Sequence, residues 1–140
     1  SRARMRMMCL YQISASTKGI VIGTGNKIED FGVGFFTKYG DGGVDISPIA
    51  DCTKTQVWDM ARELKILDEI IKAEPTDGLW NDGRKDVDQL GMSYSEIEYL
   101  MKNPTEPDYE KYLKLRKKNL HKMKSIPICK FDGKTNLAND

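Results

Sequence analysis

Residues 20–29 read IVIGTGNKIE, and this stretch decides the fold expected for the chain. Ile20, Val21 and Ile22 form a short run of β-branched apolar residues that ends abruptly at glycine, as a buried parallel strand does. In an open α/β sheet the ligand crevice lies beyond the carboxyl ends of the strands. The polar side chains that follow the run are therefore expected to project into such a crevice, and they are Thr24, Asn26, Lys27 and Glu29.

The residues after this run have the chemistry of a phosphate and metal site. Thr24 offers a hydroxyl to a phosphate, and Glu29 offers the hard oxygen ligands that Mg²⁺ prefers. Gly23 and Gly25 let a ligand approach the backbone closely. The spacing matches neither a Walker P-loop nor the GxGxxG fingerprint. The residues alone therefore leave a second interpretation open, a glycine-rich turn that carries a solvated glutamate.

A second glycine-rich stretch, residues 35–45, reads FFTKYGDGGVD. Packing alone does not require glycines and aspartates at this density. Lys38 can meet an anion, Asp45 can accept hydrogen bonds from hydroxyls, and the glycines allow positive φ or close approach. The alternative is a hairpin turn around Asp41 and Gly42 in which Lys38 is merely solvated. These two interpretations are about equally well supported by the residues.

Helix signals dominate the rest of the chain. Thr53 and Gln56 fit a capping box at the start of one helix. Ser93 and Glu96 fit a second, for a short helix that ends before Pro104. The polar residues 77–89 are expected to form a mobile loop able to close over a site.

Pro107 is expected to open a longer helix with one apolar face and one basic, solvated face. The apolar face comprises Tyr109, Tyr112, Leu113, Arg116 and Leu120, and the solvated face comprises Lys114, Lys117 and Lys118. The first residues, 1–13, are also helical in pattern. Their three arginines would oppose the helix dipole unless the helix begins further upstream or an anion lies nearby.

Composition excludes several classes of protein. The 22 basic residues nearly balance the 21 acidic ones, so no general attraction for nucleic acid or membranes is expected. No apolar run approaches the length of about 20 residues that a membrane span requires. The three cysteines are odd in number and widely separated, which argues against a disulfide framework and favours a reducing, cytoplasmic location.

The order of these motifs resembles the ammonia-dependent NAD synthetases, members of the N-type ATP pyrophosphatase group. The resemblance begins with GTGNKIED, continues through GFFTKYGDGGVDISPI and DCTKTQV, and extends over nearly the whole chain. The later matching segments are EPTDGLW at 74–80, DQLG at 88–91, SYSEI at 93–97 and the pair HK at 121–122. The implied fold is an α/β fold of the adenine-nucleotide α-hydrolase-like, Rossmann-like type, with a parallel sheet.

The family carries an SGGxDS loop that cradles the ATP pyrophosphate, and no such loop exists in these 140 residues. We therefore expect residues 1–140 to be the C-terminal portion of a single NAD synthetase domain, with an incomplete sheet and a helical C-terminal part. This portion is expected to be inactive by itself.

The resemblance implies that nicotinic acid adenine dinucleotide (deamido-NAD) is adenylated by ATP on its carboxylate, with loss of pyrophosphate, and that ammonia then displaces AMP to give NAD. It also implies the roles of particular residues. Glu29 would bind Mg²⁺, and ATP would be held by Thr24, Lys54 and Thr76. Deamido-NAD would be held by Arg4, Lys38, Asp45, His121 and Lys122. None of these is an evident general base.

Several of these residues have a second interpretation that their types leave open. Lys54 in a first helical turn is usually solvated, Thr76 suits a turn hydroxyl, and a histidine near a helix end is commonly a cap or exposed. The sequence also departs from the family pattern at Met123, where an arginine is frequent.

The resemblance implies a homodimer when the protein is intact, and it leaves open an upstream glutaminase domain as the source of ammonia. Two alternative functions remain. One is another adenylating amidotransferase or thiolating enzyme of the same fold, and the other is a non-catalytic nucleotide-binding module.

Overall fold

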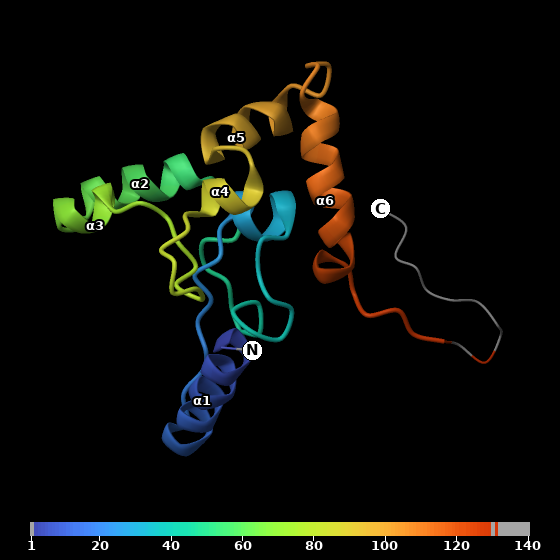
Figure 1. Ribbon diagram of the computed structural model, residues 1–140. Helices are drawn as coiled ribbons and strands as arrows, with labels where there is room; N and C mark the ends of the chain where they lie inside the picture. The colour runs from blue at the N-terminus through green and yellow to red at the C-terminus, as the bar shows by residue number, and fades with distance from the viewer. Residues whose placement is uncertain (1, 130, 132–140) are drawn as a thin grey trace.

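A computed structural model describes residues 2–129 and 131 of the 140-residue chain. Helices account for all the regular elements of this part, and Figure 1 shows α1 set apart from the group formed by α4, α5 and α6. In chain order the elements are α1 (Arg2–Thr17), the π-helix η1 (Lys27–Val33), α2 (Lys54–Glu63), α3 (Asp68–Lys72), α4 (Asp86–Leu90), α5 (Tyr94–Lys102) and α6 (Tyr109–Met123). None of these described helices is both long enough and apolar enough to cross a membrane.

Both predicted capping boxes are present. Thr53 accepts a hydrogen bond from the Gln56 amide and the Gln56 side chain accepts one from the Thr53 amide, which starts α2. Ser93 and Glu96 form the same reciprocal pair at the start of α5. Each box satisfies two of the amides that a helix start leaves without intrahelical partners.

The expected helix near Pro107 is confirmed as α6, which begins two residues later at Tyr109. Its predicted apolar face is buried or half-buried, and Lys114, Lys117 and Lys118 are exposed. Tyr112 is 4% exposed and lies in the core. This core joins η1, α4, α5 and α6, and its buried members are Ile28, Val33, Leu90, Met92, Tyr94, Ile97, Leu100 and Tyr112.

The buried parallel strand expected at residues 20–22 is not formed in the described part of the chain. One parallel bridge joins Ile22 to Ile46, and the Gly23 amide donates to the Ile46 carbonyl at 2.7 Å. Val21 is buried, but Ile20 and Ile22 are 59% and 58% exposed. A strand buried on two faces needs cover on both, and the described residues cover only the Val21 side. The prediction of parallel pairing here is therefore confirmed for one bridge, and the prediction of a buried strand is wrong for the described residues.

The glycine-rich stretch after η1 forms successive turns rather than a hairpin between strands. The Thr37 carbonyl accepts from the Gly40 amide at 2.8 Å, and the Thr37 amide donates to the Asp41 carboxylate at 2.9 Å. A β-carbon on Gly42 would lie 2.3 Å from the Phe36 ring, so this position requires glycine for close approach.

The arginines at the start of α1 donate hydrogen bonds to backbone carbonyls of other segments. Arg2 donates to the Leu79 carbonyl at 2.9 Å, and Arg6 donates to the Gly78 carbonyl at 3.1 Å. They tie α1 to the polar segment that was predicted to be a mobile loop. The last part of that segment is not a loop, because residue 86 begins α4 and Asp86 is buried.

Candidate functional site

The short helix η1 places the first candidate residue, Glu29. Its N-terminal cap is Asn26, which is 2% exposed and whose side-chain oxygen accepts from the amides of Ile28 and Glu29 at 2.9 and 3.0 Å. At the other end, Gly34 has φ of 64° and ends the helix in the left-handed conformation. Two well-defined ends therefore fix the direction of the Glu29 side chain.

Glu29 belongs to a cluster that we call the acid–lysine cluster, made of Glu29, Lys54, Asp86 and Tyr94. Lys54 Nζ lies 2.7 Å from Glu29 Oε1, and each of these two side chains is only 17% exposed. Lys54 Nζ also lies 5.0 Å from the centroid of the Tyr94 ring. The Tyr94 hydroxyl donates to Asp86 Oδ2 at 2.6 Å. The cluster therefore draws one side chain from each of η1, α2, α4 and α5.

Burial and neighbouring charges shift the pKa values of two members of the acid–lysine cluster, Asp86 and Tyr94. Burial raises the pKa of Asp86, and the charges of Glu29 and Asp77 raise it further, whereas Lys54 lowers it. Burial also raises the pKa of the Tyr94 phenol, with the Glu29 charge as the next cause. Tyr94 therefore stays protonated and acts as a hydrogen-bond donor.

The N-terminus of α2, which carries Lys54, is held in place by a second buried acid. Glu98 on α5 is 9% exposed and accepts from the Thr55 amide at 2.9 Å and from the Thr55 hydroxyl at 3.0 Å. A carboxylate at the positive end of a helix is stabilising. α5 therefore positions the first turn of α2 as well as Tyr94.

The predicted dinucleotide residues Lys38 and Lys122 lie together at a cavity of about 280 Å³, which we call the lysine cavity. Lys38 Nζ donates to the His121 carbonyl at 2.8 Å. Lys122 Nζ donates to the carbonyls of Gly34 and Phe36 at 2.6 and 2.7 Å. Burial lowers the pKa of Lys122. The structure thus brings Lys38 together with His121 and Lys122, which follow it by more than 80 positions in the sequence.

Asp30 connects the two sites. It follows Glu29 in η1 but lines the lysine cavity. Burial raises the pKa of Asp30 to about 7, the charges of Glu29 and Asp41 add to the rise, and Lys122 opposes it. A β-carbon on Gly25 would lie 1.9 Å from Asp30 Oδ2, so this carboxyl packs directly on the glycine of the GTG motif.

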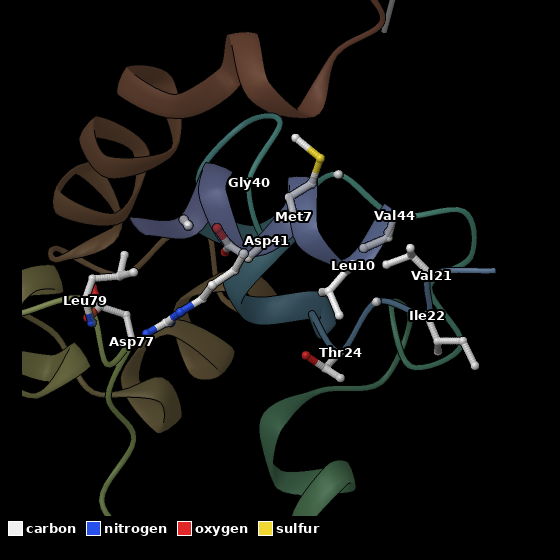
Figure 2. Close-up of a pocket in the computed structure, with 14 residues that line it drawn as sticks. Met7, Leu10, Val21, Ile22, Thr24, Gly40, Asp41, Val44, Asp77 and Leu79 are labelled. Atoms are coloured by element: carbon white, nitrogen blue, oxygen red, sulfur yellow. The ribbon is translucent and has the colours of Figure 1, made fainter. Parts of the chain in front are cut away.

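Thr24 lines a different, mostly apolar cavity of about 330 Å³. In Figure 2 Leu10 of α1 lies above Thr24, with Val21, Ile22 and Val44 on one side and Asp77 and Leu79 on the other. Thr24 is exposed, and its cavity is separate from the lysine cavity. The polar side chains that line this cavity are Arg6, Thr24, Asp41 and Asp77.

The remaining predicted residues, which are Arg4, Asp45 and Thr76, lie outside the acid–lysine cluster and the lysine cavity or at their edges. Arg4 on α1 is exposed and its Nε lies 3.4 Å from the Lys38 carbonyl oxygen. Asp45 accepts from the Tyr11 hydroxyl at 3.1 Å and from the Val21 amide at 2.7 Å, so its carboxylate supports the parallel bridge. Thr76 donates to the Arg84 carbonyl at 3.2 Å, which is the turn hydroxyl of the alternative interpretation.

Sequence reasoning missed Asp30, Asp86, Tyr94 and Glu98. Asp86 stood among several aspartates of a polar segment, and nothing local distinguished it. Tyr94 belonged to the matching segment SYSEI but had no role of its own. A signal for Tyr94 was available in the sequence, because the capping box at Ser93 places Tyr94 in the first turn of a helix.

The chemistry of the donors allows a divalent cation at Glu29. No group of three or more His, Cys, Asp or Glu side chains among the described residues is arranged to hold a metal ion. Mg²⁺, however, is commonly bound through one or two carboxylates together with substrate phosphates. Glu29 supplies one such carboxylate, on a side chain that is only 17% exposed. The donors therefore fit a cation shared with a phosphate ligand.

Comparison with known proteins assigns the family. A family model described as NAD synthase matches residues 1–136, so the chain belongs to the NAD synthase family. It is 40% identical over 128 residues to an NH₃-dependent NAD⁺ synthetase of Thermoplasma volcanium, covering 86% of this chain and 52% of that protein. It is 41% identical over 128 residues to the corresponding protein of Carboxydothermus hydrogenoformans, covering 90% and 51%.

Solved structures agree with this assignment. The NMN synthetase of Francisella tularensis matches with a TM-score of 0.83 at 35% identity, covering 92% of this chain and 54% of that one. The NH₃-dependent NAD synthetase of Campylobacter jejuni matches with a TM-score of 0.66 at 26% identity, covering 92% and 53%. The chain spans about half the length of the relatives that it matches, and within this span the fold is that of the NAD and NMN synthetases.

Proposed function

We propose that the protein containing these residues converts deamido-NAD to NAD with ATP and ammonia. A carboxylate oxygen of the nicotinate group attacks the α-phosphorus of ATP, and pyrophosphate leaves. The nitrogen of ammonia then attacks the activated carbonyl carbon, a proton is lost from nitrogen, and AMP leaves. Adenylation is needed because a free carboxylate is a poor acyl donor to an amine.

The observation that carries this proposal is the position of η1 between the acid–lysine cluster and the lysine cavity. Glu29 meets Lys54 on one side, and the next residue, Asp30, lines the cavity that contains Lys38 and Lys122. A reaction that joins a triphosphate to the carboxylate of a second nucleotide needs two such sites side by side. Holding both reactants in register lowers the entropic part of the barrier.

In this proposal the residues act by binding and orienting rather than by transferring protons. Glu29 would hold Mg²⁺, which would neutralise charge on the phosphate oxygens. ATP is held by Thr24, Lys54 and Thr76. The cations of the lysine cavity orient the second nucleotide, and Asp45 supports the segment that leads to them. The described contacts of Lys38 and Lys122 to carbonyls must loosen or share their protons when an anion binds.

The proposal extends to the whole domain and its assembly. We propose that residues 1–140 form the C-terminal portion of one synthetase domain, because they cover about half of the relatives. Self-association in the intact protein is supported by apolar side chains of α1 that are largely exposed, among them Met5, Met8 and Ile13, at 61%, 61% and 58%. Such a row of exposed apolar residues favours contact with another surface.

A second candidate substrate is the deamido mononucleotide. The solved structure with the TM-score of 0.83 is an NMN synthetase, whereas the NAD synthetase structure gives 0.66. The chemistry of the amide ligation is the same for both acceptors. The lysine cavity, at about 280 Å³, has room for part of a dinucleotide only, which leaves the length of the acceptor open.

The test is product formation by the natural gene product that contains these residues, with the 140-residue chain assayed beside it. ATP, Mg²⁺ and ammonium are supplied with deamido-NAD, with the deamido mononucleotide, or with neither, and products are identified by mass spectrometry. We expect NAD from the gene product and no turnover by the 140-residue chain alone. Adenylation of a different acceptor, or nucleotide binding without turnover, would overturn the proposal.

The matched variants are Glu29→Gln in the acid–lysine cluster and Glu63→Gln on the exposed side of α2. Both remove one carboxylate charge by the same substitution. Glu29→Gln should reduce turnover by a factor of about a hundred or more, because a charge-neutralising group in the transition state is lost. Glu63→Gln should leave turnover within about twofold, as expected for an exposed residue far from the site.

A further inference from the structure

Asp86 carries a feature that the proposed function does not use. Its side chain is 6% exposed, and Oδ2 accepts from the Tyr94 hydroxyl at 2.6 Å. The other oxygen, Oδ1, is buried and has no hydrogen-bond partner among residues 2–129 and 131. A buried carboxylate oxygen without a partner is unfavourable, because its hydration is lost and not replaced. Such an oxygen indicates that a donor reaches it in another state of the protein.

Lys54 is the cation of the acid–lysine cluster. Its ammonium contacts Glu29 at 2.7 Å and lies over the ring of the tyrosine whose hydroxyl contacts Asp86. The Lys54 charge already acts on the Asp86 carboxyl. Lysine has a flexible stem and three donors, so a small rotation of its last bonds can exchange one acceptor for another.

Lys54 contacts Glu29 through Oε1, so a divalent cation bound by this carboxylate would lie close to the ammonium. A cation at Glu29 would repel the ammonium at close range. This repulsion favours movement of Lys54 away from Glu29, and at a largely buried position a new acceptor would stabilise the ammonium.

We propose that Asp86 is a positioning residue for Lys54. When a divalent cation takes Glu29, Lys54 leaves Glu29 and donates to Asp86 Oδ1 while remaining over Tyr94. Its two other protons then face the phosphate that the cation shares. This inference deepens the proposed function, on which it rests in taking Glu29 as the carboxylate of the cation.

The test measures binding of Mn²⁺ alone to the 140-residue chain and does not depend on turnover. Affinity is read from water-proton relaxation, and the site is read from paramagnetic broadening of the η1 amides in ¹H–¹⁵N spectra. Asp86→Asn should weaken Mn²⁺ binding at Glu29 by at least about threefold, the size of coupling expected between contacting charged groups. Lys54→Met should strengthen it, because the competing ammonium is gone.

The control for loss of charge is Asp77→Asn. Asp77 also acts electrostatically on Asp86, but both of its oxygens have partners, the Leu79 amide at 2.9 Å and the Gln89 side chain at 3.1 Å. We expect this variant to change Mn²⁺ affinity by less than about twofold. An effect equal to that of Asp86→Asn would overturn the proposal in favour of simple charge.

The decisive measurement is Asp86→Asn in the Lys54→Met background. If Asp86 acts through Lys54, the second substitution has no further effect on Mn²⁺ affinity. An equal loss in both backgrounds would mean that Asp86 serves the cation directly and would overturn the proposal. Absence of Mn²⁺ at Glu29 even in Lys54→Met would also overturn it, whether or not the natural gene product makes NAD.

If the Asp86→Asn variant does not fold, the proposal is tested on the unsubstituted chain. Addition of Mg²⁺ should move nuclear Overhauser contacts of the Lys54 ε-methylene from Glu29 toward Asp86. Contacts that stay on Glu29 at saturating Mg²⁺ would overturn the proposal. A purely structural role for Asp86 would not produce this change.

Discussion

Replacing Asp30 with asparagine should stabilise the protein, and only at pH values above the acidic range. Asp30 is half-buried, packs against Gly25, and lies near the negative charges of Glu29 and Asp41. Its pKa is raised from an ordinary value of 3.8 to about 7. The native state therefore holds a proton on Asp30 under conditions in which the unfolded chain has released it.

The sign and size of the effect follow from this difference. Between pH 4 and pH 7 the native state binds more protons at this carboxyl than the unfolded state, so stability falls as pH rises. Above pH 7 the full destabilisation caused by ionised Asp30 is present, and below pH 4 it is absent. About three pKa units correspond to an upper limit of about 4 kcal/mol. Partial exposure screens part of it, so we expect asparagine to add about 1–3 kcal/mol at pH 8.

The assay is urea unfolding of both proteins at pH 8 and pH 4.5, followed by circular dichroism in buffer with a chelator. The gain from Asp30→Asn should be large at pH 8 and should shrink at pH 4.5. The control is Asp51→Asn, because Asp51 is exposed and its contact with Lys27 lowers its pKa. That variant should not gain stability as pH rises. An equal gain from Asp30→Asn at both pH values, or none at pH 8, would refute the reasoning.

Five other substitutions, at four positions, test how the site is held, each by urea unfolding. Asn26→Ala should lower the free energy of unfolding by about 1–2 kcal/mol because a buried oxygen that caps two amides is lost, whereas Asn26→Asp should retain most of the stability. Thr53→Ala should cost about 1 kcal/mol by removing the capping box of α2. Lys122→Met should cost about 1–3 kcal/mol because two carbonyls lose their donor, more than Lys38→Met, which frees one. Equal losses in the two lysine variants, or no loss for Asn26→Ala, would contradict these assignments.

The helical part of the fold could be predicted because its signals are local. The capping boxes at Thr53 and Ser93 involve residues three positions apart, and both are present. The face of α6 follows from the helical period, and Tyr112 is buried as expected. The segment around Ile22 was harder, because a strand depends on partners elsewhere in the chain. Its pattern predicted the parallel pairing, but its burial depends on cover that the described residues do not provide.

The candidate site could be predicted only in part for a related reason. The family resemblance singled out Glu29 and Lys54, and the structure pairs them. It also singled out Asp45 and Thr76, whose described contacts are structural. Asp86 was not found, because its importance comes from burial and from an unpaired oxygen. Neither property has a signature in residue type or spacing.

Lys54 shows how a local conflict can indicate a site. A cation in the first turn of a helix opposes the helix dipole, and this cost has no local compensation in the sequence of α2. The compensation comes from other elements, since Glu29 of η1 pairs with the ammonium and Glu98 of α5 caps the same turn. Two acids from other elements therefore hold this turn, Glu29 through the Lys54 ammonium and Glu98 through the Thr55 amide and hydroxyl. An unfavourable local choice that is retained and supported in this way is expected where function needs it. In the proposed function the position of Lys54 at the start of a helix and beside Glu29 serves the binding of a phosphate.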